Sequence, residues 1–188
     1  MENPFRNLFN KHENTEYTEG IKEKIETAKE HALAFEVFNE LNQKQAAYQM
    51  KEIQETASEE ELEYIKEIET LLEKSTITTF SRDEFSDILK KFGLNLKIIP
   101  EIVEHEAQHI EVAEKLGAIN NGYQCIIHEH PTSPTGYALY AAANIDLPKE
   151  WDIAKKEEIL KQIIKAPEEI GISMSSGDKN LLQLLENK

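Results

Sequence analysis

Residues 100–117 read PEIVEHEAQHIEVAEKLG and carry the clearest helix signals of the chain. Pro100 suits the first turn of a helix because it has no N–H group to leave unpaired, and Gly117 suits the left-handed position that ends one. Between them, apolar residues recur at three- and four-residue steps: Ile102, Val103, Ala107, Ile110, Ala113 and Leu116. This spacing predicts a single amphipathic helix that packs one face against a core.

Three polar side chains of this helix fall on its apolar side. Successive residues turn by about 100°, which places His105, Glu106 and His109 in the apolar sector. Buried polar groups cost free energy unless they have partners. A metal ion would supply that partner; the alternative is that the three residues form ordinary hydrogen bonds inside a helical bundle.

The same residues form the pattern H-E-x-x-H. Histidines four positions apart on a helix lie on one face and can bind one metal ion, while the intervening glutamate can act as a general base toward water. A bound metal lowers the pKa of water enough to make it a nucleophile for amide hydrolysis. The pattern therefore predicts His105 and His109 as metal ligands and Glu106 as the catalytic base.

Residues 105–109 resemble the zincin-type metallopeptidases, and the resemblance covers this helix only. It implies a Zn²⁺ cofactor and a peptide or protein substrate. The metzincin branch is excluded because Val112 and Lys115 stand where its glycine and third histidine belong. In the glutamate-liganded branch the third ligand comes from a later helix, for which Glu157 and Glu158 are candidates.

Other histidines are alternative third ligands. His128 and His130 would share one face of a strand, and a strand that returns along the motif helix could bring either of them to the metal; we take His130 as the first candidate. The alternative is that both lie at an exposed strand end. His31, beside the apolar stripe of the first helix, would give a site that resembles the three-histidine site of DinB-like bundles, or else is a half-buried surface residue.

The remaining sequence predicts an α+β fold that is mostly α-helical. We expect a helical region over 1–80 with two long helices, and an α+β region over 81–188 that carries the motif helix. The first 14 residues read as a tail that docks through its aromatic residues. The expected elements are helices over 15–49, 58–72, 81–92, 100–116 and 155–164, the last ended by Pro167; hairpin strands over 123–127 and 137–145; a loop over 171–178; and a short helix or tail over 181–185.

Composition limits the partners and the compartment. The chain has 21 Lys and Arg against 36 Asp and Glu, a net charge of −15, which argues against nucleic acid and against anionic membranes. A single cysteine, Cys125, allows no intrachain disulfide and favours a reducing compartment. With no signal-like or membrane-spanning apolar run, we expect a cytoplasmic protein. The sequence does not indicate an oligomeric state.

Two main functional hypotheses follow. The first is a zinc-dependent metallopeptidase, or a related metal-dependent hydrolase, with Glu106 as its base. The alternative is a non-catalytic, acidic helical protein that mediates interactions or binds a metal, with the motif in a structural role. A third reading is a ferritin-like or DinB-like bundle in which Glu106 and His109 bind iron or another metal.

Overall fold

The computed structural model describes the backbone of residues 6–187 and the side chains of residues 17–187 apart from positions 45 and 52. The predicted fold class, a mostly α-helical α+β protein, is confirmed. No helix in the described part of the chain has the length and apolar character needed to cross a membrane. In chain order the elements are α1 (Arg6–Glu30), α2 (Phe35–Ile53), α3 (Glu59–Ser75), β1 (Thr76–Thr79), α4 (Arg82–Phe92), α5 (Ile99–Leu116), β2 (Ile119–Glu129), β3 (Tyr137–Asp146), α6 (Ile153–Glu169) and α7 (Ser176–Glu186).

The three strands form one antiparallel sheet in the order β1-β2-β3, so that β3 is an edge strand. The expected hairpin is the pair β2 and β3. Gly122 lies in the irregular part of β2 between Asn120 and Tyr123. It has φ 91°, and a Cβ atom there would lie 2.6 Å from the carbonyl oxygen of Thr79. Only glycine fits this close approach between β1 and β2.

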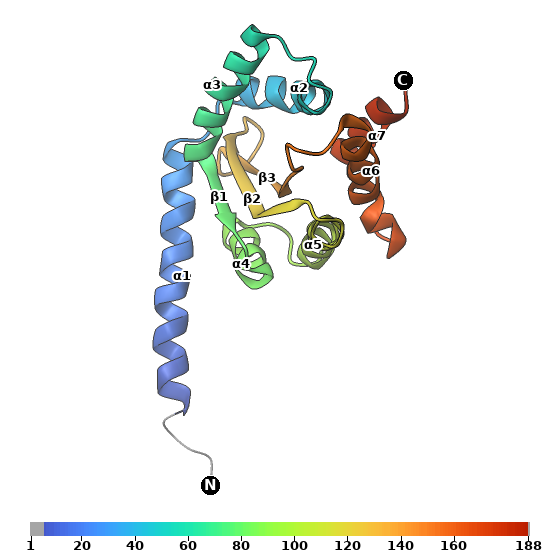
Figure 1. Ribbon diagram of the computed structural model, residues 1–188. Coiled ribbons are helices and arrows are strands. Elements are labelled where there is room, and N and C mark those ends of the chain that lie inside the picture. The colour runs from blue at the N-terminus through green and yellow to red at the C-terminus, as the bar shows by residue number, and fades with distance from the viewer. Residues whose placement is uncertain (1–5, 188) are drawn as a thin grey trace.

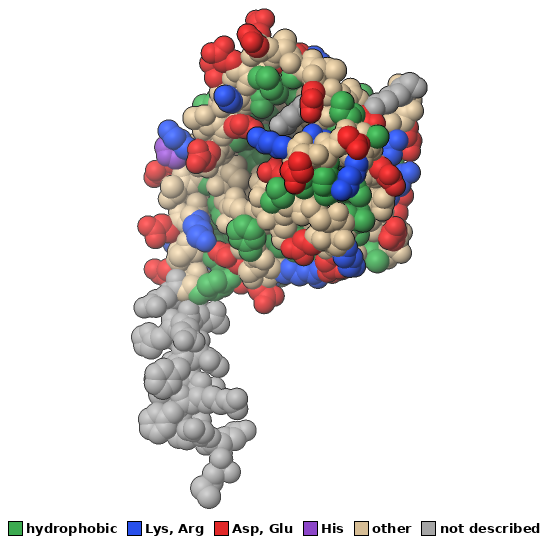
Figure 2. All heavy atoms as spheres, in the orientation of Figure 1, with side chains coloured by type: hydrophobic (Ala, Val, Ile, Leu, Met, Phe, Trp, Pro, Cys, Tyr) green, Lys and Arg blue, Asp and Glu red, His purple; other side chains and the backbone are tan. Residues whose placement is uncertain are grey.

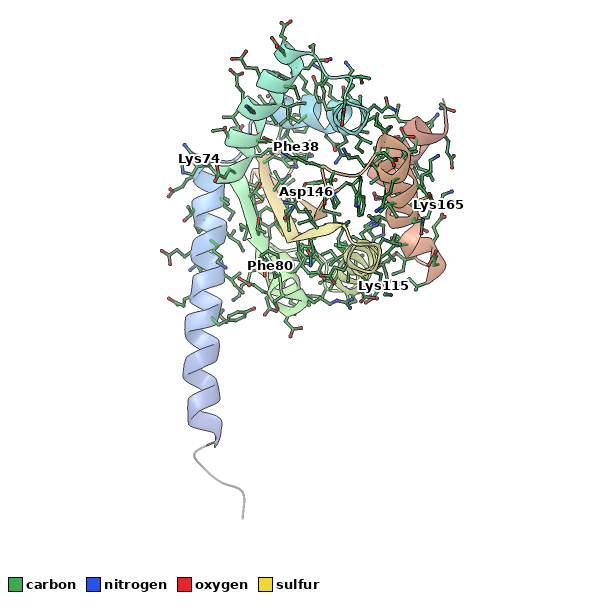
Figure 3. The ribbon with its side chains drawn as sticks, in the orientation of Figure 1. Phe38, Lys74, Phe80, Lys115, Asp146 and Lys165 are labelled. Atoms are coloured by element: carbon green, nitrogen blue, oxygen red, sulfur yellow. The ribbon has the colours of Figure 1, made fainter. Side chains whose placement is uncertain are left out.

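Helices cover the sheet on both sides (Figure 1). On one side, α1, α4 and α5 pack on it around the fully buried Phe85 and Ile88 of α4. On the other side, Phe38 of α2 packs with Leu33 and Ile126 (Figure 3). Helices α6 and α7 lie beyond the edge strand, where Met50 of α2 packs against Ile164, Leu182 and Leu185.

The N-terminal region differs from the prediction in two ways. The single helix expected over 15–49 is two helices, because the chain breaks at residues 31–34 to place Leu33 beside β2. The N–H of Leu33 donates to Ile127 O at 3.4 Å, and Glu129 N–H donates to Leu33 O at 2.8 Å. The expected tail is also partly wrong, because helix α1 already begins at Arg6; Pro4 and Phe5 lie outside the described residues.

The sequence predicts two regions, 1–80 and 81–188, but the hydrophobic core is continuous across them. Strand β1, from the N-terminal part, pairs with β2 from the C-terminal part. In addition, Ile21, Ile25 and Ala28 of α1 belong to the same buried cluster as Phe85. The two expected regions therefore share one core.

The C-terminal part also differs from the prediction. Pro167 does not end α6, which continues to Glu169, and the expected loop over 171–178 ends earlier because α7 begins at Ser176. Acidic and basic side chains are interspersed over the face seen in Figure 2. Many of the ion pairs are surface pairs such as Lys44 with Glu40, which contribute little to stability.

Candidate metal centre

The two histidines and the glutamate of α5 point into the protein. His105, Glu106 and His109 are 8%, 9% and 6% exposed, as the helical period predicts. The helix that carries them has Pro100 in its first turn and ends at Gly117, whose φ is 85° and whose N–H bonds back to the last turn. The local sequence therefore fixes both the length of α5 and the face that it buries.

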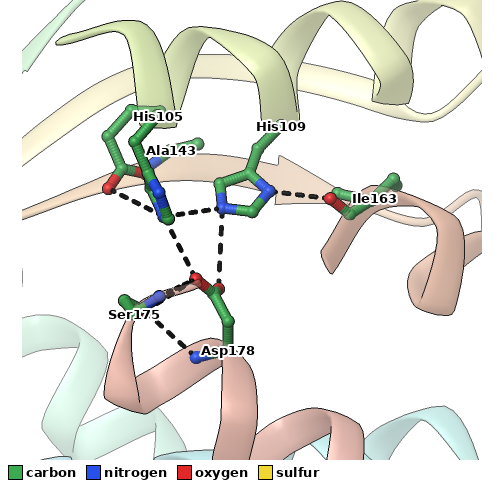
Figure 4. A network of polar contacts seen from close by, with 7 residues as sticks. His105, His109, Ala143, Ile163, Ser175 and Asp178 are labelled. Atoms are coloured by element: carbon green, nitrogen blue, oxygen red, sulfur yellow. Dashed lines mark hydrogen bonds and ion pairs between the residues drawn. The ribbon is translucent and has the colours of Figure 1, made fainter. Parts of the chain in front are cut away.

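Asp178, on the first turn of α7, joins the two histidines. His105 Nε2 lies 3.1 Å from Asp178 Oδ2, and His109 Nε2 lies 3.5 Å from Asp178 Oδ1 (Figure 4). The two Nε2 atoms are 3.1 Å apart. Among the described residues, these three side chains form the group that could hold a metal ion.

The spacing of these atoms fits a tetrahedral metal ion. Ligand atoms at 2.0–2.1 Å from a tetrahedral ion are about 3.3–3.4 Å from one another. The two Nε2 atoms are 3.1 Å apart, His105 Nε2 is 3.1 Å from Asp178 Oδ2, and His109 Nε2 is 3.5 Å from the other oxygen, Oδ1. With one ligand atom from each residue, the three atoms lie within 4.8 Å of one another, so small shifts would bring them to a common ion. Two imidazoles and one carboxylate would fill three of four positions and leave the fourth for water or substrate, as in catalytic sites.

His109 is oriented by a backbone carbonyl. Its Nδ1 lies 2.7 Å from Ile163 O, and because a carbonyl can only accept, Nδ1 carries the proton. With a metal bound, the ring would be neutral and the lone pair of Nε2 would lie toward His105 and Asp178. Without the metal, Nε2 can carry a second proton and donate to Asp178. In α6 this carbonyl would normally accept from the residue four positions later, which is Pro167 and has no N–H.

Asp178 is oriented by the N-terminal cap of its own helix. Ser175 donates to Asp178 Oδ2 from its backbone N at 2.9 Å and from Oγ at 2.7 Å, while Ser175 Oγ accepts from Asp178 N–H. This is a capping box. The bonds that start α7 therefore also position the carboxylate toward the two histidines.

Glu106 lies beside the three-residue group. Its Oε2 accepts from the N–H of Ala143 on the edge strand at 2.7 Å, and its Oε1 lies 4.0 Å from His105 Nε2. Burial raises the pKa of this carboxyl, and the two histidines and the Ala143 N–H only partly oppose the shift. A carboxylate held next to the metal position, with a raised pKa, is suited to take up a proton from water.

Opposite charges stabilise each other within the centre. Burial opposes ionisation of Asp178, but hydrogen bonds from His105 and His109 outweigh it and hold the pKa of Asp178 well below its usual range. Burial likewise opposes a charge on His109, but Asp178 outweighs it and raises the pKa of His109. The carboxylate is therefore ionised at neutral pH, as a metal ligand must be.

His130 and His128, the first candidates for a third ligand, are not brought to this centre. His128 stacks on Phe38, with ring centroids 3.7 Å apart, and its Nδ1 donates to Glu129 O. His130 meets the ring of Phe35 edge-on at 5.1 Å. Both rings therefore pack against α2, at the end of the hairpin where Leu33 joins the sheet.

The other candidates also lie apart from Asp178 and the two histidines. His31 is exposed at the end of α1. On α6, Glu158 is exposed, and Glu157 accepts a hydrogen bond from Gln54 at 3.2 Å. Asp178, and none of these residues, lies with His105 and His109 in the group that could hold a metal ion.

Asp178 is the residue that sequence reasoning missed. Its signal was Ser175-x-x-Asp178 before Leu181, Leu182 and Leu185, which is a capping box followed by an apolar run. That pattern predicts a helix start but not that its aspartate faces another helix. No protein-family model, curated protein or solved structure matches this chain, so the centre is defined by its own geometry.

Proposed function

We propose that this protein is a zinc-dependent peptidase in which His105, His109 and Asp178 hold the metal and Glu106 is the general base. The observation that carries the proposal is that Asp178, 73 residues after His105, lies 3.1 Å from it, with Glu106 buried alongside. The buried free thiol of Cys125 is consistent with the reducing, cytoplasmic setting that we also propose.

The roles of the side chains follow from their geometry. Zinc held by these residues would supply Lewis acidity, which would lower the pKa of water toward neutrality and polarise a carbonyl. Glu106 is held in place through Oε2 by Ala143 N–H, which leaves Oε1 to accept a proton from the attacking water. As the C–N bond breaks, the same carboxyl group returns that proton to the amine that leaves.

Metal content and peptidase activity of matched variants test the proposal. We expect about one zinc per chain, peptidase activity against a mixture of unstructured peptides, and loss of activity on chelation. The Glu106→Gln variant should retain zinc but lose activity by about 100-fold or more, because the amide cannot accept the proton. A purified protein that takes up no zinc would contradict the proposal.

One observation favours the non-catalytic alternative. The hydrogen bond from Ala143 N–H to Glu106 joins α5 to the edge strand, which is a structural role. Under that alternative the wild-type protein has no peptidase activity, and Glu106→Gln should alter only the melting temperature. A fall in melting temperature without a catalytic defect would therefore support this second reading.

A further inference from the structure

A pocket of about 310 Å³ opens beside the metal centre. His105 and Glu106 form part of its wall, so that a molecule in the pocket lies next to the proposed zinc position. The volume is at the lower end of the range for small-ligand sites. Most of the remaining wall is apolar, with contributions from the loop after α4, from α5, from β3 and from the loop before α7: Leu94, Ile98, Ile102, Leu139, Ala141 and Ile172.

β3 is an edge strand, and alternate residues beside this pocket turn their backbone hydrogen-bonding groups away from β2. Ala143 N–H donates to Glu106 and therefore points away from β2. Backbone direction alternates along a strand, so the N–H and C=O groups of Leu139 and Ala141 point the same way. Both residues line the pocket. An extended peptide that pairs with this edge would place alternate side chains toward the pocket wall.

The chemistry of the wall selects among side chains. Apart from His105 and Glu106, Glu101 is the charged residue on the wall among those described, and it opposes an acidic occupant. In the loop between α4 and α5, two large apolar side chains are exposed: Leu96 by 68% and Ile98 by 45%. Exposed apolar groups beside a polar centre are typical of binding sites.

We propose that this pocket binds a bulky apolar side chain next to the scissile bond, so that the substrates are extended peptides with such a residue. The inference rests on the proposed peptidase function. It adds a preference that the zinc centre alone does not impose: leucine or phenylalanine is favoured over glycine, and an acidic residue is rejected.

Hydroxamates of single amino acids test the pocket directly on the zinc-loaded protein. The hydroxamate group binds zinc, and the side chain probes the adjacent wall. We expect the leucine and phenylalanine α-hydroxamates to bind about tenfold or more tightly than the glycine compound, since each methylene in an apolar pocket contributes about that factor. The glutamate compound should bind no better than glycine.

Two substitutions of similarly exposed isoleucines supply the control. Ile98→Glu places a charge on the pocket wall and should abolish the preference for leucine over glycine while zinc content stays unchanged. Ile119→Glu, at a site 49% exposed and outside the pocket, should leave the preference intact. Equal binding of all four compounds to zinc-loaded protein would overturn the pocket proposal alone, whereas absence of zinc would overturn both proposals. A change in oligomeric state caused by Ile98→Glu, with the hydroxamate preference intact, would instead identify this face as a contact between copies.

A second inference concerns Pro167, which lies inside helix α6. A proline inside a helix is unfavourable because it removes the hydrogen bond to the carbonyl four residues earlier. Here that carbonyl is Ile163 O, and the group that donates to it is His109 Nδ1, at 2.7 Å. The Pro167 side chain is itself fully buried.

We infer that Pro167 is a positioning residue for the metal centre. It keeps Ile163 O available to His109 and thereby fixes the ring with Nε2 toward the metal. In Pro167→Ala, a new backbone N–H competes for Ile163 O, so we expect zinc affinity to fall about tenfold or more, as for other groups that orient a metal-bound histidine. The zinc-free protein regains a helix hydrogen bond but loses part of a buried side chain, so its melting temperature should change little.

Pro100→Ala is the control, since Pro100 lies in the first turn of α5, where a proline removes no such bond. It should leave zinc affinity unchanged. Two results would overturn the role of Pro167: wild-type zinc affinity in Pro167→Ala, or a loss of affinity matched by an equal loss of stability in the zinc-free protein.

Discussion

Asp178 combines two roles in one side chain. Through Oδ2 it accepts the hydrogen bonds of Ser175 that begin α7, and through both oxygens it faces His105 and His109. Because hydrogen bonds from the two histidines hold its pKa far below the usual value, it carries a full charge where a metal ligand needs one. A neutral replacement should therefore separate the two roles.

We predict that Asp178→Asn loses zinc affinity by about 100-fold or more, since even partners of metal ligands contribute 10–100-fold. The amide oxygen can still accept from Ser175, so the helix start is retained. The measurement is competition with a zinc chelator of known affinity. Asp152→Asn is the control because Asp152 also stabilises a helix start, as the N-cap of α6 whose side chain accepts from Lys155 N–H, but lies outside the metal-binding group. Equal zinc affinities of the two variants would contradict the assignment of Asp178.

His128 predicts a pH dependence of stability that is separate from the metal centre. Burial lowers its pKa below the usual 6.5, and His130 adds to the shift, although the hydrogen bond to Glu129 O opposes it. The folded protein therefore binds fewer protons at this site than the unfolded chain. The contribution of neutral His128 to the free energy of unfolding is therefore complete above pH 6.5 and is lost as the pH falls below that value.

Replacement of His128 by phenylalanine keeps a ring stacked on Phe38 and removes the titration. Between pH 7 and pH 5, the free energy of unfolding of the wild type should fall more steeply than that of His128→Phe, measured by urea denaturation in the presence of a chelator. Parallel pH profiles for the two proteins would show that His128 does not titrate with folding.

At the scale of elements, the start of α7 links helix capping to the metal centre. Ser175 and Ser58 both form capping boxes, at α7 and at α3. Replacement of either by alanine should cost about 1 kcal/mol of stability. Only Ser175→Ala should also weaken zinc binding, by about tenfold or more, because Ser175 donates to Asp178. Isothermal titration with zinc compares the two variants. Equal zinc affinities would show that the Ser175 cap does not support the metal site.

Helix α5 was predictable from the sequence in more detail than the position of α7 beside it. The inward direction of His105, Glu106 and His109 was predictable because the helical period alone sets it. The position of Asp178 was not, because the packing of α6 against α5 and of α2 against α7 decides what lies near α5. The break between α1 and α2 was hidden for a similar reason: residues 31–34 include no glycine or proline, and the pairing of Leu33 with β2 outweighs their helix propensity.

At the scale of the whole molecule, the proposed zinc joins parts of the chain that are far apart in sequence. Its ligands come from α5 and α7, and α7 also packs against α2 through Met50. A ligand that binds only the folded state raises the melting temperature. We predict that a chelator lowers the melting temperature of the wild type, that zinc restores it, and that neither treatment affects Asp178→Asn. Scanning calorimetry gives the result, and a wild-type melting temperature unaffected by either treatment would argue against a structural coupling through the metal.

In the site that we propose, His105, His109 and Asp178 hold one zinc ion. A crystal structure of the zinc-loaded protein, with anomalous data collected at the zinc edge, tests it most directly. We predict one anomalous peak within about 2.0–2.2 Å of His105 Nε2, His109 Nε2 and a carboxylate oxygen of Asp178, with Glu106 beside it and not bound. A zinc-loaded crystal with no peak at these atoms, or with its peak at His128 and His130, would show that His105, His109 and Asp178 are not the zinc ligands.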